Sequence, residues 1–279
     1  DKSYLFLQGP PGTGKTFLTA KVIYNLLKDG KKIAITSNSH KVIHNLLDRI
    51  EENAINEKFE YKGLKKSSSS NKDSKYETAN IKSLDKILDI KEIQLLAATR
   101  FELAKDAYDQ VFDFIFIDEA GQISIADTIA STLCAKNIIL IGDPQQLPQP
   151  SQIIHPDNSG NSILEFLLDG RNTVLDDYGV FLNDTRRLHP KICSYISERF
   201  YDSRLNSHEE ASNRKIEIKN SSFNLNNPGI SIITTDHEFN TQKSEEEGEI
   251  IKNLYKDLLK GKFTSDDLNR KIELSDILV

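Results

Sequence analysis

One stretch near the start of the chain, Gly9-Pro10-Pro11-Gly12-Thr13-Gly14-Lys15-Thr16, constrains the fold more than any other feature. Its glycines let backbone N–H groups wrap around phosphate oxygens, at a helix N-terminus that already favours anions. Lys15 can place a positive charge on the β- and γ-phosphates, and the Thr16 hydroxyl can hold Mg²⁺. The sequence therefore predicts a site for ATP and Mg²⁺. Its phosphate-binding residues are Gly9, Pro11, Gly12, Thr13, Gly14, Lys15 and Thr16.

Short apolar segments alternate with helical stripes on both sides of this loop. The predicted strands are 4–7, 33–36, 93–98, 112–117 and 137–141, and the predicted helices are 15–28 and 39–50. Each of the three later strands is a continuous apolar run, which a parallel sheet buried on both faces requires. The pattern predicts an α/β fold in which helices cover a parallel sheet.

Two adjacent carboxylates, Asp118 and Glu119, follow the strand predicted over 112–117. The carboxyl ends of parallel strands share one edge of a sheet, so this pair is expected beside the phosphate loop. Asp118 can then orient Mg²⁺ through its water shell, while Glu119 polarises the attacking water. An Asp-Glu pair alone is more typical of a helix N-terminus. With the loop upstream, it predicts catalytic residues.

Two further segments supply candidate catalytic side chains. The turn over 142–148 carries Gln146, whose amide can hydrogen-bond the γ-phosphate and distinguish a triphosphate from a diphosphate. The segment 185–190 carries Arg187, which can act on the γ-phosphate as arginine fingers do. Neither segment is informative alone. The complete predicted catalytic set is Lys15, Asp118, Glu119, Gln146 and Arg187.

A second α/β region is predicted to begin near Asn172, which divides the chain into residues 1–172 and 173–279. Its predicted elements are strands over 180–183, 230–234 and 276–279 and helices over 190–201 and 244–260. The last helix begins with a capping-box pattern at Ser244. Because the chain contains no Met and no Trp and enters a strand at once, we expect it to be a piece of a larger protein.

Composition favours a soluble globular protein, with 38% hydrophobic and 28% charged residues in 279. No apolar run approaches the ~20 residues that a membrane span needs. Cys134 and Cys193 sit in apolar stretches and are interpreted as buried free thiols, so a reducing cytoplasmic location is expected. The net charge of −6 weighs against a large basic nucleic-acid footprint but permits a local groove.

Two features leave alternatives open. Residues 62–83 are rich in Lys, Ser and Asn, which fits a mobile solvated loop better than a basic arm on nucleic acid. His40 and His44 would share one helix face and could bind a metal ion. Without Cys or acidic partners nearby, surface or packing roles fit them better.

Taken together, these motifs resemble those of superfamily 1 helicases, in the branch that holds the nonsense-mediated-decay helicase. The segments that look like helicase motifs I, II, III and IV are 9–16, 118–122, 142–148 and 187–190. A narrower similarity is to bacterial proteins that fuse a RecB-like nuclease to this helicase. It is carried by 36–47, 65–68, His155-Pro156 and 162–168. The resemblance covers nearly all of the chain.

This resemblance implies a RecA-like P-loop NTPase sheet over 1–172 and a truncated second RecA-like domain over 173–279. It implies that Ser37, Asn38 and Thr99 lie on the nucleic-acid face. It also implies ATP hydrolysis coupled to 5′-to-3′ movement along a single strand of DNA or RNA. A nuclease domain is expected in the same parent chain. Because the later helicase motifs are absent, the isolated chain is expected to hydrolyse ATP poorly.

One departure concerns the position before Arg187, which is usually aromatic in the family but is Arg186 here. This difference puts the placement of Arg187 in question. A function of another class also fits the phosphate loop: a nucleotide-dependent switch or assembly module whose partner is a protein. Strong stimulation of turnover by single strands would distinguish the helicase from the switch.

Overall fold

The computed structural model describes residues 3–86, 90–147, 160–218, 221, 223, 225, 228–237, 240–266 and 268–279. They divide into two compact units, Asp1–Asn183 and Asp184–Val279, which we call the first and the second unit. The His155-Pro156 pair and Pro148, which contribute to the helicase resemblance, lie outside the described residues.

The first unit is built around one eight-stranded sheet with the order β4-β3-β5-β2-β6-β7-β1-β8, and every neighbouring pair is parallel. Its strands are β1 (Tyr4–Gln8), β2 (Ile33–Thr36), β3 (Gly63–Lys66), β4 (Ile81–Leu84), β5 (Leu95–Ala97), β6 (Phe112–Ile117), β7 (Ala135–Gly142) and β8 (Gly179–Phe181). Its helices are α1 (Lys15–Lys28), α2 (His40–Asn56), α3 (Arg100–Leu103), α4 (Ile125–Thr132) and α5 (Ile163–Leu168), with 3₁₀ turns η1 (Lys72–Ser74), η2 (Asp106–Tyr108) and η3 (Ala120–Gln122). The predicted α/β, RecA-like parallel sheet is confirmed.

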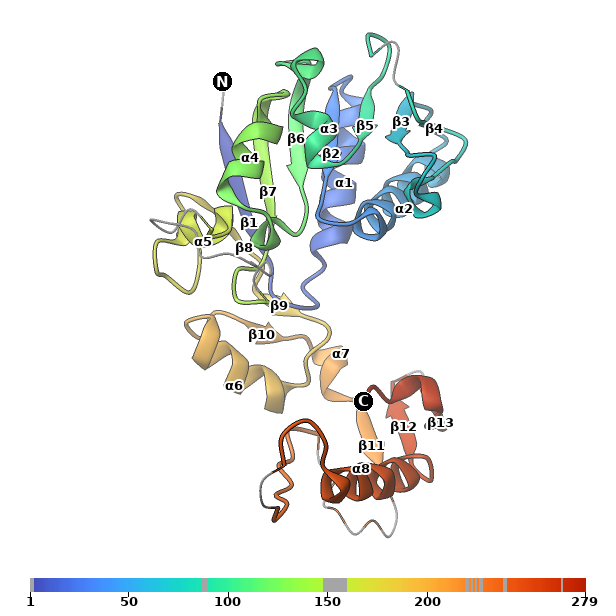
Figure 1. Ribbon diagram of the computed structural model, residues 1–279, viewed down its shortest axis with the longest axis vertical. Helices are drawn as coiled ribbons and strands as arrows, with labels where there is room; N and C mark the ends of the chain where they lie inside the picture. Colours follow the sequence, from blue (N-terminus) through green and yellow to red (C-terminus); the bar gives the residue numbers. More distant parts are fainter. Residues whose placement is uncertain are drawn as a thin grey trace. The chain divides into compact units, whose positions relative to one another are not determined.

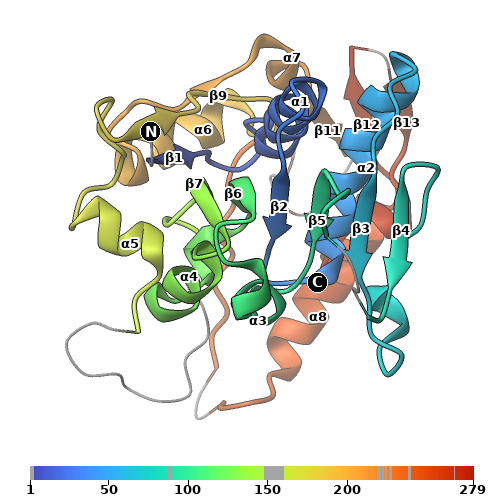
Figure 2. The same ribbon diagram turned by 90° about the horizontal axis from the view of Figure 1, so that it is seen from above.

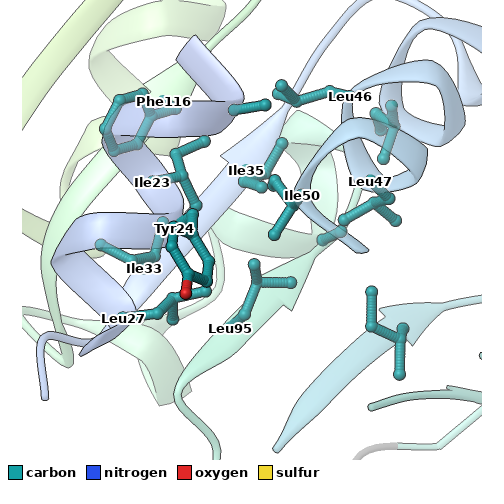
Figure 3. Packing of buried hydrophobic residues seen from close by; sticks show 14 of the residues in the cluster. Ile23, Tyr24, Leu27, Ile33, Ile35, Leu46, Leu47, Ile50, Leu95 and Phe116 are labelled. Carbon is teal, nitrogen blue, oxygen red and sulfur yellow. The ribbon is translucent and has the colours of Figure 1, made fainter. Parts of the chain in front are cut away.

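Helices cover both faces of this sheet, with α1 and α2 on one side and α3, α4 and α5 on the other (Figures 1 and 2). The core under α1 and α2 is a close-packed hydrophobic cluster (Figure 3). Its members include Ile23, Tyr24 and Leu27 of α1, Leu46, Leu47 and Ile50 of α2, Ile33 and Ile35 of β2, Leu95 of β5 and Phe116 of β6. Burying each such side chain stabilises the fold by about 1.5–3 kcal/mol, so this cluster fixes the sheet that carries the loops.

Local signals set the bounds of the two long helices. Helix α1 ends at Lys28, and the chain turns at Gly30 with a φ of 72°, a left-handed conformation that favours glycine. Helix α2 starts after Ser39, whose side chain accepts a hydrogen bond from the Val42 N–H at 3.3 Å. The bounds predicted for α1 are therefore confirmed, whereas α2 runs past its predicted end at Ile50.

The segment 62–83 partly corrects the prediction of a solvated loop, because its two ends are strands and only the connection between them is largely exposed. It contributes β3 and β4 to the sheet, and Lys65 is 0% exposed. The Lys65 Nζ donates to the Lys66 carbonyl at 2.8 Å and lies 3.1 Å from the His40 Nδ1. Strand β3 pairs with β5 on one side and β4 on the other, so its backbone N–H and C=O groups have hydrogen-bond partners. A lysine-rich strand can therefore form here without an apolar run.

Strand β8 corrects a second prediction, which placed it in the second region. It pairs with β1, with Leu7 opposite Val180, and thereby forms the edge of the first sheet. The first unit accordingly runs to Asn183 rather than to residue 172.

The described residues of the second unit form two small sheets and two main helices, α6 and α8. Its elements are β9 (Asp184–Thr185), α6 (Pro190–Phe200), β10 (Asn206–Ser207), α7 (Glu209–Ser212), β11 (Lys215–Glu217), α8 (Glu245–Leu258), β12 (Lys262–Ser265), β13 (Leu268–Lys271) and the 3₁₀ turn η5 (Leu274–Asp276). Strands β9 and β10 pair in parallel, and β11, β12 and β13 form an antiparallel sheet. Both predicted helices are present, and Ser244 caps α8 by accepting from the Glu247 N–H at 3.2 Å.

Two strands predicted in the second unit do not form. Residues 230–234 are irregular, and Ile232 is 86% exposed. The expected strand over 276–279 also does not form, because Asp276 ends η5 and residues 277–279 are irregular. Asp276 pairs with Arg270 at 2.5 Å, which stabilises η5. Both segments are apolar enough to form strands, but neither has a neighbouring strand to pair with among the described residues.

Both cysteines are buried, and neither is in a disulfide. Burial raises the pKa of the Cys134 thiol to about 12, so it stays protonated. His40 and His44 make packing contacts, because His44 lies against the Tyr76 ring at 5.0 Å between centroids. Among the helices that the structure describes, none combines the length and the apolar character that crossing a bilayer requires.

Candidate nucleotide-binding site

The phosphate loop connects β1 to α1 at the carboxyl edge of the sheet, the lower edge in Figure 1. It begins with a hydrogen bond from the Gly9 N–H to the Gly142 carbonyl of β7 at 3.0 Å. Within it, Thr13 Oγ1 donates to the Pro10 carbonyl at 2.8 Å, which closes the turn. Gly14 has a φ of 81° and precedes Lys15, the first residue of α1. This left-handed position explains why the loop requires glycine there.

The loop presents donors without acceptors. The backbone N–H groups of Gly12, Gly14 and Thr16 have no protein acceptor among the described residues, and Gly14 gives α1 no side-chain cap. The Lys15 Nζ donates to the Gly9 carbonyl and so lies across the loop. A side chain at position 9 would overlap the Lys15 stem, which accounts for the first glycine of the motif. These unused donors and the cation fit a chain of phosphates.

Asp118 follows β6, the strand next to β7, and so lies at the same carboxyl edge of the sheet as the phosphate loop. Its side chain is 4% exposed, and its Oδ1 accepts from the Glu119 N–H at 2.9 Å. Burial, together with the nearby Glu119 charge, raises the pKa of Asp118 to about 6, although Lys15 and the Glu119 N–H oppose this. A buried carboxylate that lacks a full counter-charge is suited to a divalent cation. Asp118 and Thr16 would hold Mg²⁺ here.

Glu119 is half-buried and has a φ of 54°, a left-handed conformation that costs a residue other than glycine about 1–3 kcal/mol. Such strain persists only where the surroundings enforce it, and it is commonest at functional sites. The chain then forms η3, whose Gly121 comes close to β7: a Cβ there would lie 3.1 Å from the Asp143 carbonyl oxygen. The loop after β6 therefore packs directly on the turn after β7.

Gln146 lies in the turn after β7, where Asp143 orients it. The Gln146 Nε2 donates to Asp143 Oδ2 at 3.0 Å, and the Gln145 N–H donates to Asp143 Oδ1 at 3.2 Å. Asp143 is itself 4% exposed. Asp143 thus holds the Gln146 amide in the turn next to the strand that leads into the phosphate loop, and the sensor role of Gln146 stays a prediction.

The three residues predicted to bind nucleic acid follow β2 and β5, at the same edge of the sheet. Asn38 is exposed, whereas Ser37 is 4% exposed and donates through Oγ to Asn38 Oδ1 at 3.3 Å. Thr99 caps α3 by accepting from the Glu102 N–H at 3.4 Å. The structure thus brings all three to the edge that carries the phosphate loop, and their binding of nucleic acid stays a prediction.

Arg187 lies in the second unit, where it follows β9 and is exposed. Its N–H donates to Thr185 Oγ1 at 3.2 Å, and its carbonyl accepts from Arg214 Nη1 at 3.2 Å. Arg186, which replaces the aromatic residue usual in the family, pairs with Glu210 at 2.9 and 3.0 Å. The role of Arg187 as an arginine finger stays a prediction.

Three residues near the site received no role from sequence. Asp143 orients Gln146, and Gln122 contacts Asn38 through an amide–amide hydrogen bond. Gln8 is fully buried and makes two hydrogen bonds to the backbone of the segment before β8. Its Nε2 donates to the Asn172 carbonyl at 3.0 Å, and its Oε1 accepts from the Val174 N–H at 2.7 Å. For Gln8 and Asp143 the sequence did offer a signal, since each is a polar residue at or directly after the end of an apolar strand.

Two protein-family matches agree with this geometry, and both families are described as AAA domain. They cover residues 1–152 and 160–273. The first match covers more than half of the chain and includes the phosphate loop, Asp118-Glu119 and Gln146. The chain belongs to the AAA-domain family, and together with its helicase relatives these matches identify it as a superfamily 1 helicase sequence.

Among curated proteins, the chain is similar to "DNA replication ATP-dependent helicase/nuclease DNA2" of Gallus gallus, with 26% identity over 81% of this chain and 22% of the relative. The protein of the same name from Saccharomyces cerevisiae is 29% identical over 53% of this chain and 10% of its own length. "DNA replication ATP-dependent helicase/nuclease JHS1" of Arabidopsis thaliana is 27% identical over 59% and 12%. The chain thus spans about a fifth or less of these relatives.

Among solved structures, the chain is similar to an arterivirus nonstructural protein 10 (helicase) in complex with DNA. The TM-score is 0.46 at 15% identity, over 74% of this chain and 41% of that one.

Proposed function

We propose that this chain is the ATP- and Mg²⁺-binding part of a helicase motor that hydrolyses ATP to move along single-stranded nucleic acid. The observation that carries this proposal is the convergence of three loops at one sheet edge. The phosphate loop, Asp118-Glu119 and the turn with Gln146 follow β1, β6 and β7, which are neighbours in the sheet. Parallel α/β sheets bind their ligands at this edge.

Each residue has a defined role in this proposal. The loop N–H groups and Lys15 bind the β- and γ-phosphates, and Glu119 orients and deprotonates the attacking water. When bound by Thr16 and Asp118, Mg²⁺ supplies positive charge that stabilises the transferring phosphoryl group. Gln146, held by Asp143, detects the γ-phosphate. Arg187 is assigned its finger role on the resemblance to helicase motif IV alone.

The proposed track crosses the same edge, over Ser37, Asn38 and Thr99. Because superfamily 1 members of this branch move 5′-to-3′, we assign that direction. The names of the relatives, DNA replication helicase/nucleases, favour DNA over RNA as the track. They also support a nuclease domain in the same parent chain, of the RecB-like kind that the bacterial resemblance indicates. A cytoplasmic location remains the expectation for this protein.

The test is the ATP turnover of the protein that carries this chain, measured with and without a single-stranded DNA oligonucleotide and with its RNA counterpart. We expect strong stimulation by DNA, and loss of that stimulation in Glu119→Gln. Turnover that is indifferent to both oligonucleotides but responds to a protein partner would support a nucleotide-dependent switch instead.

A further inference from the structure

One side-chain contact joins the loop after β2 to the loop after β6. Asn38 Nδ2 donates a hydrogen bond to Gln122 Oε1, and Asn38 Oδ1 accepts from Ser37 Oγ at 3.3 Å. Asn38 is exposed at the proposed track, whereas Gln122 is half-buried close to the proposed catalytic pair. The contact therefore links the two proposed ligand sites through a single hydrogen bond between side chains.

Gln122 is the last residue of η3, the short turn that follows Glu119. Its N–H donates to the Glu119 carbonyl at 2.9 Å, so the position of Gln122 depends on the strained backbone at Glu119. The next residue, Ile123, is 1% exposed and accepts at its carbonyl from the Ile163 N–H at 3.1 Å. The turn is strained at Glu119 and held in place at Ile123. A change in the backbone conformation of Glu119 would therefore move Gln122, which lies between them.

Turn η3 also contacts the loop that carries the γ-phosphate sensor. Gly121 packs on the Asp143 carbonyl, and a Cβ at Gly142 would lie 3.1 Å from the N atoms of both Ala120 and Gly121. Interfaces packed this closely shift between discrete arrangements rather than deform continuously. Movement of either catalytic loop therefore reaches η3 directly.

The backbone beneath this contact is a much stiffer connection. The Asp118 N–H donates to the Thr36 carbonyl at 3.0 Å, which continues the pairing of β2 with β6. Thr36 and Asp118 are both buried at the end of paired strands. The strand ends thus stay together, and the Asn38–Gln122 hydrogen bond is the part of this connection that can change with the nucleotide.

We propose that Gln122 is a positioning residue that couples the nucleotide site to the nucleic-acid track by setting the orientation of Asn38. This inference rests on the proposed helicase function. Coupling between two ligands is reciprocal, and typical values change an affinity about 5–150-fold. Bound nucleotide should therefore change affinity for a single strand, and a bound strand should change affinity for nucleotide by the same factor.

The experiment measures the affinity of the protein that carries this chain for a single-stranded oligo-dT, with and without Mg²⁺ and a non-hydrolysable ATP analogue. The ratio of the two affinities is the readout. We expect a ratio that differs from one by about fivefold or more in the unmodified protein. Gln122→Met keeps the length of the side chain but removes the acceptor, and should bring the ratio to within about twofold of one.

Two variants separate positioning from general damage to the fold. Gln122→Glu retains an oxygen that accepts from Asn38 Nδ2, so it should preserve the ratio. Asn53→Ala removes an amide from the exposed face of α2, where Nδ2 donates to the Arg49 carbonyl at 2.7 Å, and should also preserve it. Asn38→Ala should lose the coupling, and adding Gln122→Met to it should cause no further loss.

A ratio for Gln122→Met equal to that of the unmodified protein would overturn the assignment, provided that both melt at similar temperatures. A ratio of one in the unmodified protein, with both ligands bound, would also overturn it but leave the proposed function intact. Failure of the unmodified protein to bind any single strand would instead refute the proposed track, and this inference with it.

Discussion

At the scale of single residues, Lys15 is the side chain on which nucleotide binding depends most. It lies across the phosphate loop, with its Nζ on the Gly9 carbonyl, so removing it leaves the loop backbone without its only side-chain cation. Charge-assisted hydrogen bonds of this kind contribute about 1.5–3 kcal/mol each. We expect Lys15→Ala to weaken Mg·ATP binding about 10- to 100-fold by calorimetry. Lys21→Ala, an exposed lysine on the same helix, is the matched control.

The Asp118 carboxylate should lower the stability of the fold while it supports the proposed binding of Mg²⁺. Its carboxyl has a pKa of about 6 in the fold, above the ordinary value of 3.8, so the folded state binds the proton more tightly than the unfolded state. The buried charge therefore destabilises the fold above pH 6, by up to about 3 kcal/mol, and the cost is relieved as the pH falls from 6 to 4. Asp118→Asn should raise the free energy of unfolding at pH 8 in urea titrations without nucleotide. The same variant should lose the Mg²⁺ dependence of ATP binding, whereas an unchanged or lower stability would contradict the burial argument.

At the scale of elements, sequence identified the strands that were continuous apolar runs and missed those that were not. Strands β2 and β6 have the predicted bounds, because burial on both faces favours a mainly apolar run. Helix α1 has them because the phosphate loop precedes it and the left-handed Gly30 follows it. Strand β3 was missed because Lys65 and Lys66 occupy half of it. The buried Lys65 ammonium finds a polar partner that is distant in sequence, His40. No local sequence pattern reveals such a partner. The predicted site residues of the first unit follow strand ends, so the sequence could place them at one edge of the sheet, and their roles stay predictions. The Asn38–Gln122 and Asp143–Gln146 contacts required the folded loops.

Strand β3 provides a test of pH dependence. Burial, with a smaller contribution from the Lys66 charge, lowers the pKa of Lys65 from 10.5 to about 8. Between these two values the unfolded chain binds the proton and the folded chain does not, so stability due to this group rises with pH from about 8 to 10.5. The full gain is about 3 kcal/mol. Because the tyrosines of the unfolded chain also titrate near this range, the measurement is the difference in unfolding free energy between the unmodified chain and Lys65→Met. A difference that stays constant from pH 7.5 to 10.5 would show that Lys65 is charged in the fold.

At the scale of the whole molecule, the chain combines two units of very different construction. The first unit buries a continuous core between its sheet and helices, whereas α8, the longest helix of the second unit, has no buried residue. Among the described residues of the second unit, the buried apolar side chains are few: Cys193, Tyr201, Leu205, Ala211, Ile218 and Ile272. Regions with little buried apolar surface unfold at lower free energy. The nucleotide loops, which all belong to the first unit, are therefore carried by the more stable part of the chain.

This asymmetry predicts two unfolding transitions in scanning calorimetry, with the second unit melting first. Mg·ADP should stabilise only the later transition, because the phosphate loop, Asp118 and Gln146 all lie in the first unit. At a concentration about 100 times the dissociation constant, this stabilisation is about 2.7 kcal/mol. The diphosphate is the appropriate ligand, since it lacks the γ-phosphate on which Arg187 is proposed to act. Lys15→Ala at the same ligand concentration should show a smaller shift of the later transition and an unchanged earlier one. A single transition, or equal shifts of both, would show that the two units unfold as one cooperative structure.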